Sequence, residues 1–196
     1  MNFHPIDDRC IVHITGPPAC GKTTLGETIR MECPTWVVYD TDKFIQHHNH
    51  NGKLLLDLEF RVSKEEYTKI WEAMLQKCIH DFVHRDHPRE SICFVGLLDN
   101  FAPNGVDPFR LDCVDFPFFL QVPTPELLRR YYTRASNADQ EYFEKLASKT
   151  YYLDSSNEYV DRVAHLEIWS EKEHYMKMSS GEILERCKAL YHAYKH

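Results

Sequence analysis

The stretch GPPACGKTT, residues 16–24, comes directly after the apolar run CIVHIT at residues 10–15. It fits the pattern G-x-x-x-x-G-K-[ST] in full, and the residues that follow it predict a helix. In a loop of this length, backbone N–H groups wrap around a phosphate, and the N-terminus of the following helix adds a partial positive charge. The sequence therefore predicts a strand, a phosphate-binding loop and a helix, in that order.

The residues of this loop have distinct expected roles in binding a nucleotide. Lys22 is expected to reach the β- and γ-phosphates as a mobile positive charge, and the Thr23 hydroxyl is expected to bind Mg²⁺. Pro17 and Pro18 have no N–H and are expected to shape the loop, while Cys20 is expected to fill it. ATP and Mg²⁺ are thus the expected ligands, held by Gly16, Pro17, Pro18, Ala19, Cys20, Gly21, Lys22, Thr23 and Thr24.

Three further apolar runs of strand length follow along the chain. They are rich in β-branched and aromatic residues and comprise TWVVYD (35–40), SICFVGLL (91–98) and DFPFFLQV (115–122). Helical patterns alternate with these runs, and no repeat or linker divides the chain. We therefore expect a single α/β domain over residues 1–196, with a mainly parallel sheet flanked by helices.

The expected helices begin at recognisable capping signals. The first runs from Thr23 to about Met31, and the second, opened by a Ser63…Glu66 capping box, from Lys64 to about Val83. Two later starts are predicted, with Thr124 and Pro125 as N-cap and first helical residue and with a Ser179…Glu182 capping box. Residues 137–176 are rich in helical pattern, but their boundaries are not predicted.

Composition narrows the class of protein. The formal net charge of −7 argues against general nucleic-acid binding, and no run approaches the roughly 18 apolar residues of a membrane span. The polar start MNFHPIDDR does not look like a signal peptide. The seven cysteines never form a CxxC pair and several lie in apolar runs, so we expect them to be reduced. A cytoplasmic protein without a membrane partner is the expectation.

Three segments together resemble the small P-loop kinases. These are ITGPPACGKTTLG (14–26), VVYDTDKF (37–44) and FFLQVPTPELLRRYYTR (118–134). The family comprises nucleoside monophosphate kinases, shikimate and gluconate kinases, and the kinase modules of polynucleotide kinases. The resemblance implies a three-layer P-loop NTPase fold with small inserts, here an acceptor-binding insert at 43–64 and a lid at 129–150.

Acidic residues at strand ends are the expected acceptor site. The resemblance implies an aspartate facing the γ-phosphate, and Asp42 is the expected acceptor base, with Asp40 beside it as a further substrate or Mg²⁺-water contact. The alternative is that one of them caps the next helix. Asp99 ends the third apolar run and is expected to touch the acceptor, and in the insert Arg61 or Lys53 is expected to grip an acceptor phosphate.

Arginines on the predicted helix after Thr124 are expected to bind the transferred phosphate. At 100° per residue, Arg130 and Arg134 share one edge of the apolar stripe, and Arg129 points to solvent. Guanidinium groups stabilise the charge that spreads over a phosphate during transfer, so these two residues are the expected clamps. The alternative is a solvated basic edge.

Two classes of function remain open on this sequence. The first is a kinase that moves the γ-phosphate of Mg-ATP to a small acceptor, most simply a nucleoside, a nucleotide or a sugar-like compound. The second is an ATP-binding or weakly hydrolytic module that acts through a protein partner. The histidine-rich stretches HHNH (47–50) and His80…His84 do not complete a set of four metal ligands, so Thr23 is the only expected metal contact.

Overall fold

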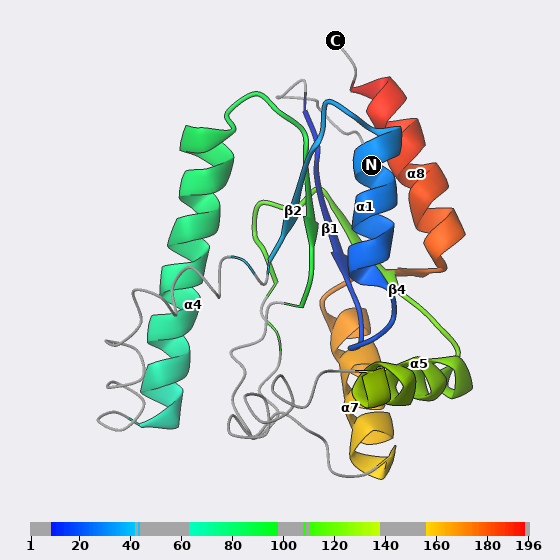
Figure 1. Ribbon diagram of the computed structural model, residues 1–196. Coiled ribbons are helices and arrows are strands. Elements are labelled where there is room, and N and C mark those ends of the chain that lie inside the picture. The colour runs from blue at the N-terminus through cyan, green and yellow to red at the C-terminus, as the bar shows by residue number, and fades with distance from the viewer. Residues whose placement is uncertain are drawn as a thin grey trace.

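A five-stranded parallel sheet lies between two layers of helices (Figure 1). The computed structural model describes residues 9–41, 43, 63–97, 108, 110–137 and 156–194. In chain order the elements are β1 (Ile11–Thr15), α1 (Lys22–Glu32), β2 (Val37–Asp40), α4 (Lys64–Asp81), the π-helix η1 (Phe82–Asp86), β3 (Ile92–Val95), β4 (Phe116–Leu120), α5 (Thr124–Asn137), α7 (Ser156–Lys172), β5 (Met176–Met178) and α8 (Ser180–Ala193).

The strand order places the glycine-rich loop at a change of direction in the sheet. The order is β2-β3-β1-β4-β5, and every neighbouring pair is parallel. The strands that follow β1 in the chain, β2 and β3, lie on one side of it. The later strands β4 and β5 lie on the other side. In open parallel sheets ligands bind outside the carboxyl ends of strands at such a switch point. The loop that leaves β1 at Gly16 lies at this position.

Two large hydrophobic cores hold the helices on the sheet, and a third, smaller cluster of Phe119, Leu166, Trp169 and Tyr175 joins β4 to α7. Helices α1 and α8 cover one face of the sheet, while α4 packs on the other face, as Figure 1 shows. The first core includes residues of β1, β3, β4 and both covering helices, among them Val12, Ile14, Leu25, Ile29, Cys93, Val95, Phe118, Leu120, Ile183 and Cys187. The second contains Ile11, Leu75, Ile79, Val83, Ile92, Phe94, Leu111 and Val114. Alternation along the strands sends side chains to both cores.

The predicted mainly parallel sheet with flanking helices is confirmed, with several differences in detail. All four expected strands are present, whereas β5, only three residues long, was not predicted. Helix α5 begins at Thr124 itself, so this residue lies inside the helix rather than at the predicted N-cap position. The second helix ends at Asp81 and continues as a π-helix, instead of running regularly to Val83. Ser63 and Ser179 are the N-caps of α4 and α8 as predicted, but only at Ser179 do both halves of the capping box form, since at Ser63 only the bond from the Glu66 N–H is present.

A buried polar pair, His13 and Tyr175, joins β1 to the residue that precedes β5. The side chain of His13 on β1 is fully buried, with Nδ1 2.8 Å from the Tyr175 hydroxyl and Nε2 3.1 Å from the Gly96 carbonyl oxygen. Because a carbonyl only accepts, Nε2 carries the proton, and the Tyr175 hydroxyl therefore donates to Nδ1. Burial, assisted by the nearby charge of Lys22, lowers the pKa of His13 to about 4.

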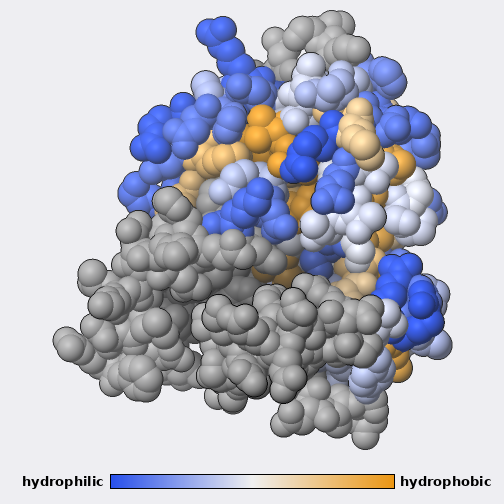
Figure 2. Space-filling model, in the orientation of Figure 1, coloured by the Kyte–Doolittle hydropathy of each residue, from blue (hydrophilic) through white to orange (hydrophobic). Residues whose placement is uncertain are grey.

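The described surface is mixed in character. On the face shown in Figure 2, small hydrophobic areas lie between hydrophilic residues. None of the helices in the described ranges is long and apolar enough to cross a membrane. All seven cysteines fall within those ranges and are free thiols, as expected, and burial raises the pKa of Cys10 and Cys187 to about 12.

Candidate functional site

The glycine-rich loop between β1 and α1 packs tightly against the end of β4. A Cβ atom at Gly16 would lie 2.9 Å from the Leu120 carbonyl oxygen and 3.0 Å from the Cys20 sulfur, so only glycine fits there. Gly21 has a φ of 101°, which side chains rarely adopt, and Ala19 takes a φ of 64° without being glycine. A positive φ at a residue other than glycine persists only where the surrounding structure enforces it. Such conformations cluster at ligand and active sites.

The ammonium group of Lys22 closes the loop from within. Its Nζ donates to the carbonyl oxygens of Gly16 and Pro17, both at 2.8 Å, and lies 3.8 Å from the Cys20 sulfur. An ammonium has three donors, and a thiol sulfur is only a weak acceptor. Two donors of Lys22 are therefore matched by carbonyl oxygens, and the third meets only a weak acceptor.

The N-terminus of α1 faces the same place. Gly21 is its N-cap and offers no side chain to the first N–H groups, and no acidic residue lies in the first turn. The backbone donors and the partial charge of the helix are therefore not neutralised by side chains of that turn. Thr23 and Thr24, in the first turn, are exposed, so the Thr23 hydroxyl is accessible from solvent. This arrangement is suited to binding an anion.

Arg130 of α5 contacts the loop from outside. Its Nη1 donates to the Cys20 carbonyl at 3.0 Å, and its Nε donates to Glu126 at 2.8 Å. Arg129 binds the same carboxylate but is exposed, with 66% of its side chain accessible. The hydrogen bonds from Arg129 have the largest effect and those from Arg130 the next largest, and together they lower the pKa of Glu126 to about 2. Of the predicted arginines, Arg130 thus lies at the loop and Arg129 lies away from it.

Tyr159 of α7 is a loop contact that sequence reasoning missed. Its hydroxyl donates to the Pro18 carbonyl at 2.6 Å, although the two residues are 141 positions apart. The ring is fully buried and stacks on Tyr131 of α5, with 4.4 Å between ring centroids. In the sequence Tyr159 is one apolar position of a helical pattern, and no local signal pairs such a position with a distant loop.

Asp40 ends β2 on the same sheet face as α1. Its register partner on β3 is Val95, a residue of the core that α1 covers. The next residue, Thr41, is buried and its N–H bonds the Val95 carbonyl at 2.9 Å. Asp40 therefore lies at the carboxyl edge of the sheet, where α1 begins, and its expected role stays a prediction.

The remaining predicted site residues fall outside the described part of the chain. Asp42, Asp99, Arg61 and Lys53 are among them. For Arg134 the structure describes only its backbone, in the last turns of α5. Their expected roles stay predictions.

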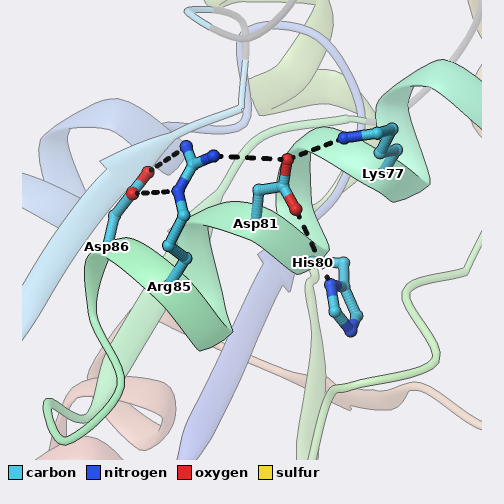
Figure 3. Close-up of polar contacts among 5 residues, drawn as sticks. All are labelled: Lys77, His80, Asp81, Arg85 and Asp86. Carbon is cyan, nitrogen blue, oxygen red and sulfur yellow. Dashed lines mark hydrogen bonds and ion pairs between the residues drawn. The ribbon is translucent and has the colours of Figure 1, made fainter.

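A charged network on α4 and η1 includes His80, whose ring also contacts that of His84. Asp81 accepts from Lys77 at 2.9 Å and faces both His80 and Arg85, and Arg85 also binds Asp86 (Figure 3). The hydrogen bond from Lys77 is the main cause of the lowered pKa of Asp81. Within the described ranges, no three His, Cys, Asp or Glu residues come together as a metal site. The cluster is a solvent-exposed ion-pair network of the kind that contributes little to stability.

Comparison of the sequence with family models and curated proteins finds no match. No family model matches it, and no curated protein has a significantly similar sequence. Inference about its activity therefore depends on the loop and the residues that surround it.

Proposed function

We propose that this protein is a P-loop kinase, which moves the γ-phosphate of Mg-ATP to a small acceptor such as a nucleoside, a nucleotide or a sugar-like compound. The observation that carries the proposal is the position of Lys22. Its ammonium bonds two carbonyls of a loop with the full G-x-x-x-x-G-K-[ST] pattern. This loop lies at the switch point of a parallel sheet and beside a helix N-terminus that has no side-chain cap. These three features favour a polyphosphate as the ligand.

The residues of the loop fit Mg-ATP in charge and in hydrogen-bonding capacity. The free N–H groups of the first turn of α1 and the remaining donor of Lys22 would hold the phosphates, and the exposed Thr23 hydroxyl would bind Mg²⁺. A magnesium ion bound there supplies positive charge that offsets the charge developing on the phosphates. Arg130 is already at the loop, where its guanidinium can shift from Cys20 and Glu126 to a phosphate oxygen.

Whether the γ-phosphate passes to an acceptor or to water depends on the residues that face it. Asp40 lies at the carboxyl edge of the sheet, and Asp42 follows two residues later in the sequence. We assign Asp42 the role of orienting an acceptor hydroxyl and accepting its proton, and Asp40 a supporting contact nearer to α1. A water molecule in place of the acceptor would make the protein an ATPase, so the carboxylate must favour the acceptor.

An acceptor screen tests the proposal. ADP release from Mg-ATP is measured with nucleosides, nucleotides, sugars, sugar acids and 5′-hydroxyl oligonucleotides, and ³¹P NMR identifies the product. We expect slow hydrolysis without acceptor and stimulation by orders of magnitude with one acceptor class. Asp42→Asn should abolish the stimulated rate and leave ATP affinity within a few-fold, since the carboxylate touches the acceptor and not the donor.

Two outcomes would contradict the kinase proposal in different ways. ATP binding without stimulation by any acceptor in the screen would favour the alternative, an ATP-binding module that acts through a protein partner. Stimulation that survives in Asp42→Asn would keep the kinase activity but remove the base from this residue.

A further inference from the structure

The carbonyl groups of the glycine-rich loop are held by donors from three parts of the chain. Lys22 occupies the carbonyls of Gly16 and Pro17, and Arg130 of α5 occupies that of Cys20. The Pro18 carbonyl is held by the Tyr159 hydroxyl of α7 at 2.6 Å. A carbonyl oxygen turned toward a phosphate would repel it, whereas an N–H would bind it. The direction of each carbonyl therefore decides how well the loop holds an anion.

At Pro18 no hydrogen bond from the loop residues that the structure describes fixes the direction of the carbonyl group. Pro17 and Pro18 have no N–H, so neither can anchor the chain by donating to another part of the protein. The Pro17 carbonyl accepts from the Cys20 N–H at 3.3 Å as well as from Lys22, so it is held from within the loop. The Pro18 carbonyl receives its bond from α7, a helix that starts 138 residues after Pro18 in the sequence.

The packing of Tyr159 keeps its hydroxyl in position to donate to the Pro18 carbonyl. Its ring is fully buried and stacks on Tyr131 at a centroid distance of 4.4 Å and an interplanar angle of 28°. Burial raises the pKa of Tyr159 well above its ordinary value, so the hydroxyl keeps its proton. The stack leaves the hydroxyl little freedom to leave the Pro18 carbonyl.

We propose that Tyr159 is a positioning residue of the loop: by holding the Pro18 carbonyl away from the anion, it sets the loop conformation that binds phosphates. This role rests on the proposed function, because it concerns the same loop. It also makes phosphate binding depend on the packing of α5 against α7, since Tyr131 and Tyr159 join the two helices.

The test compares two tyrosines that each lose one buried hydroxyl. Tyr159→Phe removes the bond to the loop, and Tyr175→Phe removes a bond of similar length to His13 in the core. The dissociation constants of Mg-ATP and of inorganic tripolyphosphate are measured by calorimetry, and stability by urea unfolding. We expect Tyr159→Phe to weaken both ligands about tenfold, because a loop that lacks this bond populates the binding conformation less often. Tyr175→Phe should change neither dissociation constant by more than twofold, since its hydroxyl does not contact the loop. Both variants should lose comparable stability.

The outcomes separate the two proposals. Equal binding by Tyr159→Phe and wild type would overturn the positioning role and leave Tyr159 as a packing residue. Tripolyphosphate binding that weakens as expected, in a protein that no acceptor stimulates, would support the role of Tyr159 and count against the kinase. Binding of neither probe by wild type would overturn both. If Tyr159→Phe does not fold, Tyr131→Leu, which removes the stack but leaves the hydroxyl, should weaken tripolyphosphate binding in the same direction, and unchanged binding would overturn the proposal.

Discussion

The Arg130 guanidinium donates to the Cys20 carbonyl at 3.0 Å, across 110 positions of sequence. The same side chain binds Glu126, and so does its neighbour Arg129, at 2.7 Å. Two consecutive arginines thus share one carboxylate, but only Arg130 reaches the loop. This difference offers a matched pair of variants on one helix.

If the protein is the proposed kinase, Arg130→Ala should weaken Mg-ATP binding and lower kcat by at least about tenfold, because it removes a loop contact and a positive charge beside the proposed phosphate site. Arg129→Ala should leave both within twofold, since its solvent-exposed side chain pairs with Glu126 and does not reach the loop. Steady-state kinetics with the acceptor found in the screen, and calorimetry for ATP alone, measure the two effects. Equal losses in the two variants would show that only the net charge of the helix matters.

Lys22→Ala should abolish most of the stabilisation that Mg-ATP gives the protein. A ligand that binds only the folded state adds about 2.7 kcal/mol at 100 times its Kd, which corresponds to several degrees in Tm. Differential scanning fluorimetry with and without Mg-ATP measures this shift. Lys77→Ala, which removes a lysine that pairs with Asp81 on α4, is the control and should keep the full shift. A full shift in Lys22→Ala would mean that the loop does not hold the phosphates.

Much of the fold could be predicted from the sequence because its signals are local. The capping box at Ser179 and Glu182 and the apolar run at Ile92–Val95 depend on residues a few positions apart, and both are correct. The strand β5 was missed because it is three residues long and Met176 is exposed, so it lacks a buried apolar pattern. Its position in the sheet is set by pairing with β4, which no local pattern encodes.

The candidate site divides in the same way. The loop and Lys22 follow from one contiguous motif, and helical periodicity correctly separated the directions of Arg129 and Arg130. Tyr159 could not be found from sequence, since its contact with Pro18 depends on how α7 packs at the end of the sheet. Contacts between segments far apart in sequence require the tertiary structure.

Gly96→Ala should destabilise the protein by about 2–4 kcal/mol, because a Cβ atom there would overlap the Thr41 hydroxyl and the backbone φ is 147°. The urea midpoint should fall while the m-value stays constant. Gly181→Ala is the control, since nothing lies within 4 Å of its Cβ, and helix propensity alone should make it neutral or slightly stabilising. Adding Thr41→Ala to Gly96→Ala should restore part of the loss. No recovery would mean that the backbone conformation, and not the overlap, is the main cost.

The buried His13 should make stability depend on pH in a defined window. Its pKa is about 4 in the folded protein, and an unfolded chain has the ordinary histidine value of about 6.5. Between these values the unfolded state binds the extra proton, so stability is complete above about pH 6.5 and falls as the pH drops toward 4. The loss from this one group between pH 7.5 and pH 5 is about 2 kcal/mol.

His13→Gln isolates this contribution. Glutamine can still donate to the Gly96 carbonyl that His13 Nε2 binds, and it does not titrate. The variant will be less stable than wild type at pH 7.5, because the Tyr175 hydroxyl loses its fitted acceptor, but the difference between the two proteins should shrink by about 2 kcal/mol at pH 5. Urea unfolding at both pH values measures it, and the other histidines cancel because they are present in both proteins. A difference that is the same at the two pH values would mean that His13 keeps an ordinary pKa, and that the sheet admits its charged form.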